Sequence, residues 1–158
     1  MGTLVLIRHA KAEPAHSDDH SRALSARGRL DAVAVGDCLR QRHLRADRVV
    51  VSTALRTQQT WEMASPEGPA PILDPGLYEN TVAHLLEVVR FTDADVETLV
   101  LVGHNPSMER LAWELDPSPQ ARSHTDVGLP TGAVAVFAVE SWAEPEAAVL
   151  RELVVPRG

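Results

Sequence analysis

Leu4-Val5-Leu6-Ile7 is an apolar run that passes directly into Arg8-His9. Apolar and polar residues do not alternate within it, so both of its faces are expected to be buried, as in a parallel sheet covered by helices on each side. Two later runs have the same form, Val49-Val50-Val51 and Leu99-Val100-Leu101-Val102. Together the three runs predict the central strands of an α/β fold.

Helical patterns lie between these strands. Ser25 precedes a predicted helix from Arg27 to Arg42, and four residues recur in it at helical spacing: Leu30, Val33, Ala34 and Cys38. Thr53 and Thr81 are predicted caps of helices over residues 55–63 and 82–90, and Pro106 fits the first turn of a helix reaching residue 115.

The last third of the chain adds two apolar runs, residues 133–139 and 148–155, which predict strands nearer a sheet edge. Two proline-rich stretches, Ser65 to Gly76 and Asp116 to Pro130, are interpreted as loops. The alternation of strands and helices predicts an α/β fold, a three-layer α/β/α sandwich with a mostly parallel central sheet, in a single domain over residues 1–158.

Composition narrows the class of protein. The chain has 158 residues, 44% of them hydrophobic and 23% charged, which is ordinary for a globular protein in water. We expect no membrane partner, because the apolar runs are far too short to span a bilayer. With one cysteine, Cys38, and no basic leader before an apolar core, a cytoplasmic location is expected. The net charge of −7 argues against nucleic acid, although one pocket can still be positive.

Polar residues follow each of the three buried runs at once. The first ends in Arg8-His9, the second in Ser52 and then Arg56, and the third in Gly103-His104-Asn105-Pro106. Ligands of open α/β sheets bind beyond the carboxyl ends of the strands, so two arginines and two histidines are expected at one edge. Arginine presents a planar fork to phosphate oxygens, and such converging cations predict a site for a dianionic phosphoryl group.

Three blocks of sequence resemble the histidine phosphatase superfamily. Residues 6–12, Leu-Ile-Arg-His-Ala-Lys-Ala, resemble its Arg-His-Gly signature in the variant of the SixA-type phosphohistidine phosphatases. Residues 52–60 resemble its Ser-x-x-x-Arg-x-x-x-Thr motif, and residues 102–106 resemble its second histidine motif. The similarity runs from about Thr3 to Val139 and implies a phosphoglycerate mutase-like fold.

The resemblance also implies roles for individual residues. His9 is the expected nucleophile, which forms a phosphohistidine intermediate, while Arg8, Arg56 and His104 bind the phosphoryl oxygens. A nucleophilic imidazole must be neutral, and Arg8, Arg56 and a protonated His104 are expected to lower the pKa of His9. No metal and no cofactor are needed, because the protein supplies the cations.

Other candidates are weighed against plainer roles. Glu79 lies where sugar-phosphate members of the family have a general acid, but the interpretation as a plain surface carboxylate is preferred. Ser52 and Asn105 are either caps or phosphate contacts, and Lys11 either is a solvated charge or attracts acidic substrates. The loop cluster His16, Asp18, Asp19 and His20 is interpreted as solvated surface rather than a metal site. Arg22, Arg27 and Arg29 are assigned to a solvated face, with one of them as an alternative substrate contact.

Three functions remain open from the sequence. The first is a phosphatase acting on phosphohistidine or another phosphoprotein, since a phosphoramidate leaves without a strong acid. The second is a phosphatase or mutase for a small phosphate ester. The third is a phosphate-binding module without turnover, against which both retained histidine motifs argue.

Overall fold

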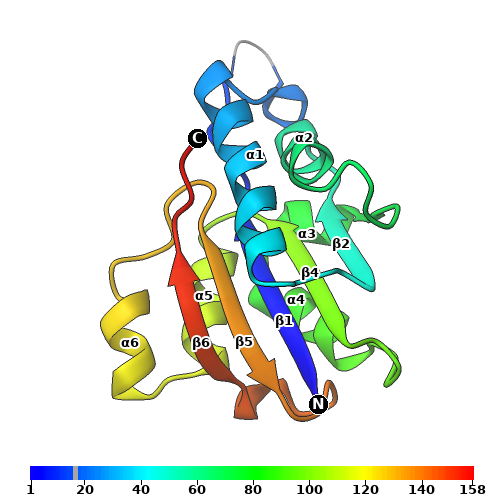
Figure 1. The fold of residues 1–158 in the computed structure, drawn as a ribbon, viewed down its shortest axis with the longest axis vertical. Helices are drawn as coiled ribbons and strands as arrows, with labels where there is room; N and C mark the ends of the chain where they lie inside the picture. The colour runs from blue at the N-terminus through cyan, green and yellow to red at the C-terminus, as the bar shows by residue number, and fades with distance from the viewer. Residues whose placement is uncertain (16–17) are drawn as a thin grey trace.

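The three buried runs form neighbouring strands at the centre of a mixed sheet (Figure 1). The computed structural model describes residues 1–15 and 18–158. Within them the sheet has six strands in the order β3-β2-β4-β1-β5-β6. Their bounds are β1 Gly2–Arg8, β2 Arg48–Ser52, β3 Ile72–Asp74, β4 Thr98–Gly103, β5 Val134–Val139 and β6 Val149–Val154. Among these strands β5 alone points in the opposite direction to the other five, so the predicted mostly parallel sheet is confirmed.

Helices cover both faces of this sheet, as predicted (Figure 1). Side chains alternate along β1, so that Val5 and Ile7 pack under α1 and α2, whereas Leu4 and Leu6 pack under α4 and α5. The α-helices are α1 Ala26–Gln41, α2 Leu55–Ala64, α3 Pro75–Glu79, α4 Val82–Arg90, α5 Ser107–Leu115 and α6 Pro119–Thr125, with short 3₁₀ turns η1 Asp19–Ser21 and η2 Pro145–Ala147. Among the described residues, no helix is both long and apolar enough to cross a bilayer.

Helix α1 turns a different face to the sheet from the one predicted. Leu30 and Val33 are 54% and 40% exposed, whereas Cys38 is buried as expected, and the buried face is completed by Val35 and Leu39. Gly28 and Gly36 lie so close to the main-chain carbonyls of Lys11 and Ala64 that an added Cβ would stand about 2 Å from those oxygens. Close backbone approach at these two glycines, together with the buried side chains of Val35 and Leu39, therefore decides how this helix packs.

The proline-rich stretches are not simple loops. The first contains β3, an edge strand paired in parallel with β2, and the start of α3; the second contains α6. In both helices proline occupies the first turn directly after a capping side chain, Asp74 or Ser118, so these prolines begin helices. Ser25 and Thr81 cap their helices as predicted, but α2 begins after Ala54 without a side-chain cap, so the assignment of Thr53 as its cap is wrong.

Candidate active site

The carboxyl ends of β1, β2 and β4 bring the predicted side chains together. Arg8 pairs in register with Gly103, so that His9 and His104 each follow the end of a neighbouring parallel strand. Their ring centroids are 5.3 Å apart. Arg56, in the first turn of α2, places Nη2 3.4 Å from Nδ1 of His104. Both histidines and Arg56 are more than nine-tenths buried.

His9 is held as a neutral imidazole with one free nitrogen. Its Nδ1 lies 2.7 Å from the carbonyl oxygen of Ala10, which can only accept, so Nδ1 carries the hydrogen and Nε2 keeps its lone pair. Burial lowers the pKa of His9 to about 4; Arg56 and Arg8 act in the same direction, whereas the Ala10 hydrogen bond opposes them. At neutral pH, Nε2 is therefore available to attack an electrophile.

His104 is neutral as well, contrary to the expectation that it is protonated. Arg56 can only donate, so Nδ1 of His104 accepts, and its Nε2 hydrogen is donated to Oγ of Ser52 at 2.8 Å. Burial, followed by His9 and Arg56, lowers the pKa of His104 to about 3. The cost of burying a charged imidazole outweighs the attraction of the nearby Asp19 carboxylate for a protonated ring. A sequence pattern does not show how deeply a side chain is buried.

Two buried arginine donors at this edge lack an acceptor. Arg8 donates from Nη1 to the carbonyl of Leu129 at 2.9 Å, yet its Nε has no partner among the described residues. Nε of Arg56 is likewise buried without a partner in the described part of the chain. Because buried polar groups are almost always hydrogen-bonded, such orphaned donors mark a place where an anion fits. The side-chain oxygen Oδ1 of Asn105 is also unpartnered, while its Nδ2 donates to Leu129.

The remaining predicted residues take different positions. Ser52 is fully buried and contacts His104, so its geometry suits holding that ring. Lys11 is exposed. Glu79 is exposed at the end of α3, and within the described residues its carboxylate makes no hydrogen bond or ion pair, so its role as an acid stays a prediction. The neighbouring Tyr78 faces the site instead, with its ring 5.7 Å from that of His104.

Thr60 explains the end of the second motif. Its hydroxyl donates to the main-chain carbonyl of Arg56 at 2.7 Å and accepts from the main-chain N–H of Ala10 at 3.0 Å. The helix that carries Arg56 is thereby joined to the residue whose carbonyl orients His9.

The loop before α1 contributes to the site, which its interpretation as solvated surface missed. Asp19 accepts from Arg56 Nη1 at its main-chain oxygen, 2.8 Å away, and its carboxylate lies 3.2 Å from Arg56 Nη2. His20 places Nε2 2.8 Å from the hydroxyl of Thr53. His16 lies outside the described residues, and among those described no cluster of metal-ligating side chains occurs. No local pattern predicts these contacts, because they depend on how the loop folds back over α2.

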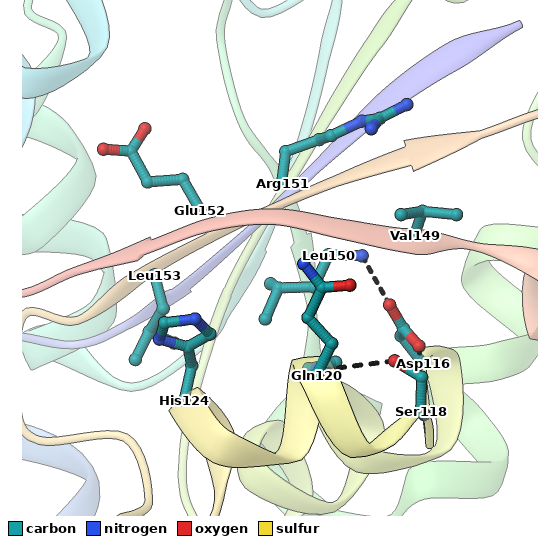
Figure 2. A pocket seen from close by; sticks show the side chains of 10 residues that line it. Asp116, Ser118, Gln120, His124, Val149, Leu150, Arg151, Glu152 and Leu153 are labelled. Carbon is teal, nitrogen blue, oxygen red and sulfur yellow. Dashed lines mark hydrogen bonds between the residues drawn. The ribbon is translucent and has the colours of Figure 1, made fainter.

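A separate hollow of about 420 Å³ lies between α6 and β6 (Figure 2). Its lining includes His124, Arg151 and Asp116. The Asp116 carboxylate accepts from the main-chain N–H groups of Leu150 at 2.8 Å and Ser118 at 3.1 Å, so it completes the edge strand and the start of α6. This hollow lies away from the ends of β1, β2 and β4.

Known proteins resemble the chain along most of its length. The family model of the histidine phosphatase superfamily (branch 1) matches residues 4–85. An uncharacterized protein of Mycobacterium tuberculosis is 34% identical over 163 residues, covering 96% of this chain and all of the relative. A solved structure from Nakamurella multipartitia, provisionally named phosphohistidine phosphatase SixA, is 35% identical with a TM-score of 0.87, covering 98% of this chain and 96% of that one. A SixA structure from Agrobacterium tumefaciens, named in the same provisional way, is 25% identical, also with a TM-score of 0.87, covering 98% and 99%.

Proposed function

Because the chain belongs to the histidine phosphatase superfamily and resembles its SixA-type members, we propose that it removes the phosphoryl group from phosphohistidine or another phosphoprotein through a covalent intermediate on His9. The observation that carries the proposal is the state of His9, a neutral imidazole whose Nδ1 hydrogen is held by Ala10. Arg8 and Arg56, which both lower the pKa of His9, each have a buried Nε donor without a partner among the described residues. The cytoplasm is the compartment we propose, since Cys38 is a free buried thiol.

In the first step, Nε2 of His9 attacks phosphorus, and the bond from phosphorus to the leaving atom breaks. Negative charge spreads over the phosphoryl oxygens, where Arg8 and Arg56 supply donors. A dianion beside His104 raises the pKa of that imidazole, because an opposite charge favours the protonated form. His104 would then donate from Nδ1 to an oxygen, while Ser52 continues to hold its Nε2.

In the second step, water attacks phosphorus and the bond to His9 breaks. The electron pair returns to Nε2, and the proton released by water leaves with the phosphate product or with solvent. Throughout, Nδ1 of His9 keeps its hydrogen and donates it to the carbonyl oxygen of Ala10, so the ring keeps one orientation through both steps.

Protein phosphohistidine is favoured as the substrate because it needs little help to leave. Glu79, the expected acid, is exposed and unpaired among the described residues. A general acid typically contributes about 10²–10⁴-fold, so an enzyme without one is suited to substrates that leave readily. A phosphoramidate nitrogen is more easily protonated than an ester oxygen.

The proposal is tested with purified protein, a chromogenic aryl phosphate, a phosphohistidine peptide and sugar phosphates. We expect turnover of the first two without added metal, and acid-labile, alkali-stable phosphate on the trapped enzyme. His9→Ala should abolish turnover, whereas the control His124→Ala, in the hollow between α6 and β6, should leave it unchanged. Equal activity of wild type and His9→Ala would refute the assignment. If the wild type binds phosphate without turnover, the protein is a phosphate-binding module and the proposal is refuted.

A further inference from the structure

Asp19 places a carboxylate directly beside the arginines of the phosphoryl site. Its Oδ2 lies 3.2 Å from Arg56 Nη2 and accepts the hydroxyl of Tyr78 at 2.8 Å. Its Oδ1 lies 3.2 Å from Nε of Arg22. The side chain is still 51% exposed, so one side of the carboxylate faces away from these partners and toward solvent.

The charge of this carboxylate is at odds with simple phosphate binding. The Tyr78 hydrogen bond, together with Arg56 and Arg22, lowers the pKa of Asp19, so it is an anion at neutral pH. An anion next to the site repels a phosphoryl dianion and weakens the field of Arg56. It repels substrates with a second negative group, such as phosphorylated sugar acids, still more strongly. A carboxylate here is favourable only if another part of the substrate carries positive charge or a hydrogen-bond donor.

Aromatic rings line the same side of the site. The rings of His20 and Tyr78 pack edge to face with centroids 4.7 Å apart, and Tyr78 packs edge to face against His104. His20 is fixed through Thr53 and Tyr78 through Asp19. The carboxylate is thus set beside flat rings, against which a planar leaving group can lie.

Building on the function proposed above, we infer that Asp19 recognises the leaving group and selects phosphoramidates whose leaving group carries a cationic N–H, above all the protonated imidazole of phosphohistidine. In phosphohistidine one ring nitrogen bears phosphorus, and the other accepts a proton. The exposed side of the Asp19 carboxylate would accept a hydrogen bond from that second nitrogen.

The bond changes then balance without an acid at the scissile nitrogen. Nε2 of His9 forms a bond to phosphorus while the substrate P–N bond breaks, and its electron pair stays on the departing nitrogen. The proton already present on the other ring nitrogen leaves with the substrate, which departs as neutral imidazole. Positive charge passes to the ring of His9, whose Nδ1 hydrogen is held by the carbonyl of Ala10 as the substrate's was by Asp19. Asp19 and Ala10 therefore play matching parts for the two imidazoles.

The test compares two substrates in Asp19→Asn, which keeps the shape and an acceptor but removes the charge. We expect kcat/KM for the phosphohistidine peptide to fall about tenfold or more, the worth of one charge-assisted hydrogen bond, with kcat/KM for the aryl phosphate changed by less than about threefold. Hydrolysis of 3-phosphoglycerate should increase. Asp18→Asn is the matched control, since the carboxylate of Asp18 only caps η1 through the N–H of His20 and the hydroxyl of Ser21.

Equal loss for both substrates in Asp19→Asn would overturn the inference, since Asp19 would then merely hold Arg56. No change in either substrate would overturn it as well, as would wild-type enzyme that turns over the aryl ester but not the phosphohistidine peptide. These results leave the His9 mechanism intact, because that mechanism fails only if His9→Ala retains activity or no phosphate is trapped. Circular dichroism and thermal unfolding of each variant show whether it is folded.

Discussion

Two regions of this molecule bring histidine, arginine and carboxylate side chains together, but they differ in how the polar groups are satisfied. In the hollow between α6 and β6, the Asp116 carboxylate is satisfied by two main-chain N–H groups. At the ends of β1, β2 and β4, by contrast, Nε atoms of Arg8 and Arg56 are buried without partners in the described chain. The presence of a hollow is therefore a poor guide to function here, and unsatisfied buried donors are a better guide.

Arg56→Lys should reveal this difference most strongly. Lysine keeps the charge but loses the planar fork that contacts Asp19 and His104 and that we propose to bind a phosphoryl oxygen. We expect kcat/KM for the aryl phosphate to fall about 10²–10³-fold, as when one donor to a transition-state oxygen is removed. Arg151→Lys, the same change in the hollow, should have no effect. Equal kinetics of the two variants would contradict the comparison.

Acid should destabilise the protein through the site histidines. The unfolded chain binds a proton at the ordinary histidine pKa, about 6.5, but folded His9 does so only at about 4, so the unfolded state gains protons first. The free energy of unfolding should thus fall between these two pH values, by about 3 kcal/mol for His9. His104, with a pKa of about 3, contributes a similar loss over the same interval and extends it to lower pH.

Urea denaturation at pH 7 and pH 4.5 measures this loss of stability. His9→Gln should remove about half of the difference between the two pH values, because His104 contributes the other half, whereas the exposed His124→Gln should keep it. A stability of wild type that does not change with pH would show that the two buried rings are not held neutral.

Asp116→Ala should give the smallest effect, and on stability alone. The substitution leaves the N–H groups of Leu150 and Ser118 without their acceptor, which should lower the free energy of unfolding by about 1–2 kcal/mol. The kinetic constants for the aryl phosphate should be unchanged, because the hollow takes no part in turnover. A large loss of activity in the folded variant would assign a function to the hollow.

Much of the site's frame follows from the sequence. Apolar runs that do not alternate predict parallel strands covered on both faces, and parallel neighbours share one carboxyl edge, so Arg8, His9 and His104 are expected together. Spacing within α2 places Arg56 and Thr60 on one side of a helix, four residues apart. These predictions succeed because they depend only on the regular geometry of strands and helices.

What could not be predicted depends on contacts between distant segments. The buried face of α1 carries Val35 and Leu39 and brings Gly28 and Gly36 against carbonyls of other segments, so the apolar pattern through Leu30 and Val33 indicates the wrong side. Asp19 reaches Arg56 only because the loop folds back. The neutral state of His104 follows from burial, which residue types alone do not reveal.

The proposed nucleophile and the proposed selectivity residue lie on parts of the chain with different freedom to vary. His9 follows β1, a strand with hydrogen-bonded neighbours on both sides, so moving it requires disruption of the central sheet. Asp19 lies in a short turn before α1, outside the sheet. Substitutions in that turn can change which molecules are accepted without altering the phosphoryl chemistry. The architecture therefore lets related proteins acquire new substrates through substitution of a few surface residues, while the reaction itself is kept.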